Sequence, residues 1–182
     1  MRTDPSLLVP TLRVTTVTEI HLDTLRSLGV KGMIFDLDDT LVHAMEPQAH
    51  PEILDWVQAI RKEFKIYIVS NNPRQDRVAL AALHLDLPFH HAARKPSRRF
   101  FRAALEEMQL DPKEVAIVGD QLFTDVLGGN RLGAVTILVD PLSSERKWHR
   151  KLMRSVERFL LDRGRVTYHV HTDVTDPADR VQ

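Results

Sequence analysis

The chain has 182 residues, with 25 lysines and arginines against 25 aspartates and glutamates, and no cysteine. This length suffices for one domain with a substantial core, and the balanced charge does not indicate a nucleic-acid partner. The lack of cysteine excludes disulfides, thiol nucleophiles and zinc–thiolate sites. No apolar stretch approaches the roughly 20 residues that span a bilayer, and the polar N-terminus does not resemble a secretory signal, so we expect a cytoplasmic protein.

Helical and strand patterns alternate along the chain. The strands are short runs of β-branched and other apolar residues, and Pro51, Gly29 and Gly133 stand where helices typically start or end. In chain order, we predict a helix over residues 20–28, a strand over 32–37, a helix over 52–64, a strand over 65–69, a helix over 74–85, an extended piece over 89–92, a helix over 98–108, a strand over 115–118, a helix over 124–132 and a strand over 135–139.

Such alternation predicts an α/β fold with a doubly wound, mostly parallel sheet. Polar residues follow three of the predicted strands: Asp36 and Asp38 the first, Ser70 and Asn71 the second, and Asp120 the third. Ligands of open parallel sheets bind beyond the carboxyl ends of the strands. We therefore expect these side chains to meet at one site.

Carboxylates are crowded after the first strand, where Asp36, Asp38 and Asp39 fall within four residues. Such groups repel one another, and a fold tolerates them most easily where a cation compensates their charge. Two aspartates at this spacing, with Thr40 close by, suit a divalent-metal site in which an aspartate is the nucleophile.

Four ordered motifs carry a resemblance to a known superfamily. Residues 36–40 read Asp-Leu-Asp-Asp-Thr, Ser70 follows a buried strand, Lys95 precedes a proline, and Asp120 is followed by Asp125. In this order they resemble the four motifs of the haloacid dehalogenase (HAD) superfamily of phosphohydrolases. The resemblance covers about residues 31–140 and implies a phosphatase with a Rossmann-like HAD fold.

The wording of these motifs is similar to a narrower branch of that superfamily. The branch is the YqeG-like part of HAD family IIIA, which is related to mitochondrial phosphatidylglycerophosphate phosphatases. The similarity lies in residues 25–42, 70–72, 94–96 and 119–125.

The resemblance implies a reaction carried by two aspartates. Asp36 would attack the phosphoryl group and form an aspartyl-phosphate. Asp38 would protonate the leaving oxygen and then activate water; ATPases of the superfamily carry threonine there, so Asp38 favours hydrolysis. Considered as single residues, either could instead be a turn or helix-capping carboxylate. Asp39 is interpreted as an oriented or capping carboxylate without a catalytic function.

Mg²⁺ is the implied cofactor, because it is a hard cation that prefers oxygen ligands. Its expected ligands are Asp36, Asp120, Asp125 and the backbone carbonyl of Asp38. Asp125 would hold a water ligand or orient Lys95, and its alternative is a first-turn helix residue stabilised by the helix dipole.

Thr40, Ser70, Asn71 and Lys95 are the expected substrate-binding residues. The Ser70 hydroxyl and the Asn71 backbone N–H would donate to phosphoryl oxygens, and Lys95 would neutralise developing charge. Alternatively, Ser70 is a helix N-cap and Lys95 a solvated lysine. Ordinary surface or satisfied positions are the interpretation for the remaining basic candidates, namely Arg94, Arg98, Arg99, His43, His50, His90, His91 and His149.

No cap domain fits the sequence, because the predicted helices and strands fill the gaps between Asp38 and Ser70 and between Ser70 and Lys95. The expected fold is therefore capless, with an open site. An open site suits a large substrate or one presented on a surface, such as a lipid headgroup.

We predict a single domain over residues 1–171, with a flexible tail over residues 172–182. Residues 144–160 have the pattern of a helix with one apolar face and several basic side chains. Such a helix suits peripheral contact with an anionic membrane, and its alternative is an ordinary packed helix with a solvated basic face.

Three functional hypotheses follow. The first is a magnesium-dependent phosphomonoesterase that acts at the membrane surface. Its phosphorylated substrate would be the anionic phospholipid phosphatidylglycerophosphate. The second is the same chemistry on a soluble sugar phosphate, nucleotide or phosphoprotein. The third, a non-catalytic HAD-fold binding module, is disfavoured by the intact set of Asp36, Asp38, Lys95 and Asp120.

Overall fold

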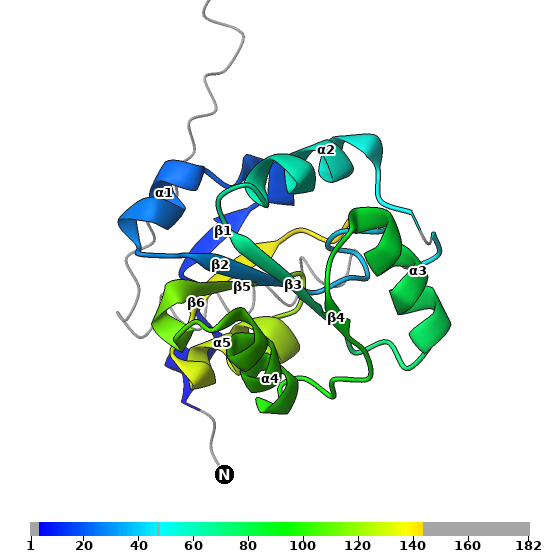
Figure 1. Cartoon of the computed structure of the whole chain (residues 1–182). Coiled ribbons are helices and arrows are strands. Elements are labelled where there is room, and N and C mark those ends of the chain that lie inside the picture. The colour runs from blue at the N-terminus through cyan, green and yellow to red at the C-terminus, as the bar shows by residue number, and fades with distance from the viewer. Residues whose placement is uncertain (1–3, 47, 144–182) are drawn as a thin grey trace, which may run out of the picture.

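The structure, a computed structural model, describes residues 4–46 and 48–143 (Figure 1). The basic helix predicted over residues 144–160 and the tail over residues 172–182 lie outside the described residues. Among the helices of the described part, none combines the length and the apolar character that crossing a membrane requires.

One open sheet of parallel strands forms the centre of the fold. Its strands are β1 (Leu12–Val14), β2 (Gly32–Phe35), β3 (Lys65–Val69), β4 (Phe89–His90), β5 (Val115–Gly119) and β6 (Val135–Val139). The six strands lie in the order β1-β6-β5-β2-β3-β4. In the centre, Ile34 of β2 lies opposite Tyr67 of β3 and Ile117 of β5.

Helices cover both faces of the sheet. They are α1 (Leu22–Ser27), α2 (Pro51–Ile60), α3 (Gln75–Leu85), α4 (Arg99–Met108) and α5 (Leu127–Leu132), with the 3₁₀ turns η1 (Pro5–Leu8), η2 (Val17–Glu19) and η3 (Pro112–Glu114) and the π-helix η4 (Leu122–Val126). Helices α1 to α3 lie on one face, and α4 and α5 on the other (Figure 1).

The core consists of two apolar layers, one on each side of the sheet. Because successive strand residues point to opposite faces, Phe35 packs in one layer with Val57 of α2, and Ile34 packs in the other with Phe101 of α4. Every residue of β2 is buried, as expected of a parallel strand covered on both faces. The predicted doubly wound parallel sheet is confirmed.

Some predicted boundaries were wrong. Strand β1 was not predicted, because three residues are too few for a periodic pattern. These residues form a strand through pairing with β6, where Leu12 lies opposite Ile137. The strand predicted over residues 32–37 ends at Phe35. Beyond it the carbonyl of Leu37 accepts the backbone N–H of Leu41 at 2.9 Å, which turns the chain.

Helix boundaries also differ from the predictions. The first predicted helix starts at Leu22 rather than residue 20, and the helix predicted over residues 52–64 ends at Ile60, after which residues 61–63 form turns. The helix predicted over residues 124–132 begins earlier, as the π-helix η4, and becomes regular only in α5.

The capless architecture is confirmed. The chain between Asp38 and Ser70 contributes α2 and β3, and the chain between Ser70 and Lys95 contributes α3 and β4. These segments belong to the sheet or its helical layers, so neither holds an inserted domain.

Candidate active site

Three neighbouring strands bring acidic and polar residues to one edge of the sheet. Asp36 directly follows β2, Ser70 follows β3 and Asp120 follows β5, and all three side chains are buried. The sheet ladder continues to this edge, since the backbone N–H of Asp36 donates to the carbonyl of Val118 at 2.8 Å. The predicted convergence of these strand ends is therefore observed.

An acidic cluster forms where the three carboxylates of Asp36, Asp120 and Asp125 meet. One oxygen of each lies within 4.8 Å of the others, and all three residues are buried. Asp125 comes from η4, where its Oδ2 accepts the backbone N–H of Gln121 at 3.2 Å. A Cβ at Gly119 would overlap the Asp125 carboxylate, so this glycine allows the close approach.

The ammonium of Lys95 lies inside this cluster. Its Nζ is 2.7 Å from Oδ1 of Asp36 and 2.7 Å from Oδ1 of Asp125, and only 2% of the side chain is exposed. The alternative of a solvated surface lysine was wrong. A buried charge of this kind is tolerated because it is paired with carboxylates.

Asn71 holds the backbone that carries Lys95. The Oδ1 of Asn71 accepts the Lys95 backbone N–H at 2.6 Å, and its Nδ2 donates to the Lys95 carbonyl at 3.4 Å. Only the backbone of Asn71 was predicted to take part in the site, so this function of its side chain was not foreseen. No sequence signal indicates it, because the two residues are joined only by the fold.

The electrostatics of the cluster follow from its burial. Burial raises the pKa of Asp36 to about 6, despite the opposing charge of Lys95. Burial alone would lower the pKa of Lys95, but the charges of Asp125 and Asp36 outweigh it and raise that pKa. Three carboxylates and one ammonium leave an excess of negative charge. The carboxylate oxygens are the ligands that a hard divalent cation prefers. The residues present therefore fit a metal site.

Asp38 lies at the same edge but outside the acidic cluster. Its Oδ1 accepts a hydrogen bond from Nη2 of Arg77 at 2.7 Å, and its Oδ2 accepts one from Nδ2 of Asn72 at 2.8 Å. Neither partner of Asp38 was predicted. Asn72 could have been found from its position in the second motif, whereas Arg77 lies within α3, where a basic residue is expected on the helix surface.

Ser70 and Thr40 are both buried beside these aspartates. The Ser70 hydroxyl oxygen accepts the Asn72 backbone N–H at 3.1 Å, which is a local turn. The helix N-cap alternative for Ser70 was wrong, because Arg74 is the N-cap residue of α3. No described residue forms a hydrogen bond with the Thr40 hydroxyl. Asp39 accepts the Ala44 backbone N–H at 3.3 Å, in agreement with an orienting rather than catalytic carboxylate.

Other basic candidates have structural partners. The Arg98 guanidinium donates to the carbonyl of Arg131, and the Arg99 guanidinium lies over the ring of Phe100. His90 approaches the Tyr67 hydroxyl and the Glu107 carboxylate at 3.3 Å each. The surface or satisfied interpretation of these residues agrees with their contacts.

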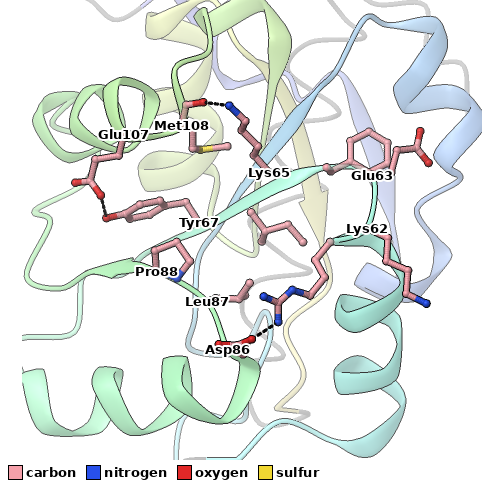
Figure 2. A pocket seen from close by; sticks show the side chains of 12 residues that line it. Lys62, Glu63, Lys65, Tyr67, Asp86, Leu87, Pro88, Glu107 and Met108 are labelled. Carbon is pink, nitrogen blue, oxygen red and sulfur yellow. Dashed lines mark hydrogen bonds and ion pairs between the residues drawn. The ribbon is translucent and has the colours of Figure 1, made fainter.

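A pocket of about 500 Å³ lies at the other edge of the sheet, near the start of β3 (Figure 2). Its polar groups largely satisfy one another: Lys65 donates to the Met108 carbonyl at 2.6 Å, and the Tyr67 hydroxyl donates to Glu107 at 2.8 Å. Because this pocket opens at the amino ends of the strands, it is separate from the acidic cluster.

Comparison with known proteins gives a family and several relatives. The profile described as mitochondrial PGP phosphatase matches residues 1–142. A probable phosphatase, YqeG, of Bacillus subtilis is 41% identical over 149 residues, which are 81% of this chain and 86% of that protein. The chloroplastic phosphatidylglycerophosphate phosphatase 1 of Chlamydomonas reinhardtii is 28% identical over 178 residues, which are 91% of this chain but only 65% of that protein.

Solved structures share the fold at low identity. An uncharacterized protein from Listeria monocytogenes aligns with a TM-score of 0.51 and 18% identity, over 74% of this chain and 99% of that one. A HAD family enzyme from Bacteroides thetaiotaomicron, solved as a magnesium complex, aligns with a TM-score of 0.51 and 13% identity, over 67% of this chain and 99% of that one. These likenesses support the HAD fold.

Proposed function

Because the chain belongs to the mitochondrial PGP phosphatase family and is a phosphatase of the HAD type, we propose that it hydrolyses phosphomonoesters through an aspartyl-phosphate on Asp36. The observation that carries this proposal is the buried cluster of Asp36, Asp120 and Asp125 around the ammonium of Lys95. A nucleophile, anionic metal ligands and a cation for the phosphoryl group meet there at one sheet edge.

In the first step, a carboxylate oxygen of Asp36 attacks phosphorus, and the bond from phosphorus to the leaving oxygen breaks. Asp38 donates a proton to that oxygen, so the product leaves as a neutral alcohol. In the second step, Asp38 takes a proton from water as the water attacks phosphorus. The bond between phosphorus and Asp36 then breaks, which releases inorganic phosphate and restores the carboxylate.

Three further residues would hold the transferred phosphoryl group. Lys95 supplies a buried positive charge that compensates the charge of the transition state. The Ser70 hydroxyl can donate its proton to a phosphoryl oxygen while the hydroxyl oxygen still accepts the Asn72 backbone N–H. The buried Thr40 hydroxyl, which no described residue satisfies, can donate or accept a further bond.

Mg²⁺ is the cofactor that these residues would hold, through the carboxylates of Asp36, Asp120 and Asp125 and the backbone carbonyl of Asp38. When bound, Mg²⁺ offsets the negative charge that the phosphoryl group adds to the acidic cluster. Asp125 also contacts Lys95, so it can orient that lysine whether or not it contacts the metal directly.

Phosphatidylglycerophosphate is the substrate that we propose. Relatives of this chain are phosphatidylglycerophosphate phosphatases by name, and the described segments between the motifs hold no inserted cap domain that would exclude a bulky headgroup. Soluble phosphomonoesters share every catalytic group with this substrate, so they are the comparison that a test requires.

The test is phosphate release by the wild type, Asp36→Asn and Asp55→Asn with Mg²⁺ present. Asp55 is an exposed aspartate of α2 and serves as the matched control. We expect Asp36→Asn to abolish release from every substrate and Asp55→Asn to behave like the wild type. Retained activity in Asp36→Asn would exclude Asp36 as the nucleophile, and a preference for a soluble ester would exclude the lipid as the main substrate.

A further inference from the structure

Arg77 connects α3 to the loop that follows β2. Its Nη2 donates to Oδ1 of Asp38 at 2.7 Å and to the backbone carbonyl of His43 at 3.0 Å. Only 10% of its side chain is exposed. In Figure 1, α3 lies beside this loop, so the contact joins two segments that are distant in sequence.

The guanidinium has donors that the described residues do not use. Its Nε is buried and has no hydrogen-bond partner there, and no described residue accepts a bond from Nη1. A guanidinium carries five N–H donors in a fixed plane, and leaving a buried cationic donor unsatisfied is unfavourable. Arg77 is therefore suited to bind an additional anionic acceptor.

Its position indicates which part of a substrate that acceptor belongs to. In the reaction proposed above, Asp38 protonates the leaving oxygen, so the Asp38 carboxyl lies on the leaving-group side of the phosphorus. Arg77 contacts Asp38, whereas Lys95 contacts Asp36 and Asp125. The buried ammonium of Lys95 is therefore placed for the transferred phosphoryl group, and the largely buried guanidinium of Arg77 is placed for the leaving alcohol.

We propose that Arg77 is a specificity-determining residue that binds a phosphodiester carried by the leaving alcohol. This inference rests on the proposed function and deepens it. In phosphatidylglycerophosphate, the leaving alcohol bears a phosphodiester on the far side of its glycerol, whereas simple phosphomonoesters bear none. The Nε–H and Nη1–H groups, which no described residue accepts, can each form a charge-assisted hydrogen bond with a phosphodiester oxygen, so Arg77 selects the substrate with the second phosphate.

The experiment compares kcat/KM for Arg77→Gln, Arg77→Lys and the wild type on three substrates. These are phosphatidylglycerophosphate in mixed micelles, its deacylated water-soluble counterpart, which keeps the phosphodiester, and glycerol phosphate, which lacks it. Arg74→Gln is the matched control, because Arg74 lies three residues earlier and its side chain is 70% exposed, with Asp76 as its ion-pair partner.

We expect Arg77→Gln to lower kcat/KM on both phosphodiester substrates on the order of tenfold more than on glycerol phosphate. Arg77→Lys should restore part of that difference, and Arg74→Gln should show none. Glycerol phosphate also reports whether the variant is folded and active, because any general loss through Asp38 affects all three substrates equally.

Four outcomes would overturn the inference. An equal loss on all three substrates would mean that Arg77 only positions Asp38. A selective loss on the micellar lipid but not on its deacylated counterpart would mean that Arg77 binds the lipid surface rather than the leaving group. A wild type that does not prefer phosphodiester substrates would contradict both this inference and the proposed substrate, whereas a wild-type preference that persists in Arg77→Gln would contradict the inference alone.

Discussion

The side chain of Asn71 forms two hydrogen bonds with the backbone of Lys95: it accepts the N–H at 2.6 Å and donates to the carbonyl at 3.4 Å. Because the Nζ of the same lysine lies 2.7 Å from Asp36, the amide of Asn71 determines where a positive charge meets the proposed nucleophile. Asn71 therefore acts on the acidic cluster through the backbone of Lys95.

Replacing Asn71 by alanine should release the Lys95 backbone and lower kcat, because the ammonium then loses its place beside Asp36. Asn130→Ala is a matched control, since Asn130 also satisfies backbone carbonyls, those of Leu7 and Val9 at 2.9 and 2.8 Å, but far from the acidic cluster. Both variants should lose about 1 kcal/mol of unfolding free energy per hydrogen bond. Steady-state kinetics on an aryl phosphate should show reduced kcat only for Asn71→Ala, and equal kcat in the two variants would contradict this account.

Removing the buried charge, as in Lys95→Met, should destabilise the protein by about 3–5 kcal/mol, because Asp36 and Asp125 lose the cation that compensates them. Mg²⁺ should recover part of that loss by binding the same carboxylates. The control is Lys31→Met, which removes an exposed ion pair with Glu114 and should change stability little. Denaturant unfolding with and without Mg²⁺ measures both effects, and similar losses in the two variants would argue against a compensating function of Lys95.

The affinity for Mg²⁺ should depend on pH through Asp36. The pKa of this carboxyl in the folded protein is about 6, above its ordinary value of 3.8. The folded state therefore holds the proton more tightly than the unfolded chain, so folding stability falls as pH rises between these two values. Mg²⁺ binds the ionised form, so its stabilising effect should grow over the same range. Thermal unfolding between pH 5 and about pH 7, with and without Mg²⁺, measures this. The dependence should weaken in Asp36→Asn, and a shift in Tm that is independent of pH in the wild type would count against the prediction.

Gly119→Ala should displace Asp125, because the new Cβ would overlap the Asp125 carboxylate. We expect weaker Mg²⁺ binding and lower activity, together with a loss of stability. The control is Gly29→Ala, where no atom lies within 4 Å of the added Cβ but φ is +73°, so the substitution strains only the backbone, by about 1 kcal/mol. Calorimetric titration with Mg²⁺ should separate the two variants, and unchanged affinity in Gly119→Ala would contradict the proposed position of Asp125 at the metal.

Local sequence determined most of the sheet and most of the acidic cluster. Strands β3 and β6 were predicted over their observed residues, because a strand buried on both faces is a continuous apolar run that needs no knowledge of its neighbours. Asp36, Ser70 and Asp120 were found for a related reason, whereas Lys95 was found only through the resemblance to the superfamily motifs. Parallel strands bring their carboxyl ends to one edge, so strand order along the chain already predicts that residues following them converge.

Tertiary structure alone decided the contacts between those residues. β1 is a strand because β6 pairs with it, Asn71 holds Lys95 through loops that meet only in the fold, and Arg77 reaches Asp38 from another element. Each of these depends on hydrogen bonds between segments distant in sequence, which leave no periodic signal in either segment. The sequence by itself therefore determined the phosphatase class and predicted the catalytic aspartates. The side chains that contact Lys95 and Asp38 emerged only in the fold, because the folded chain brings them within bonding distance.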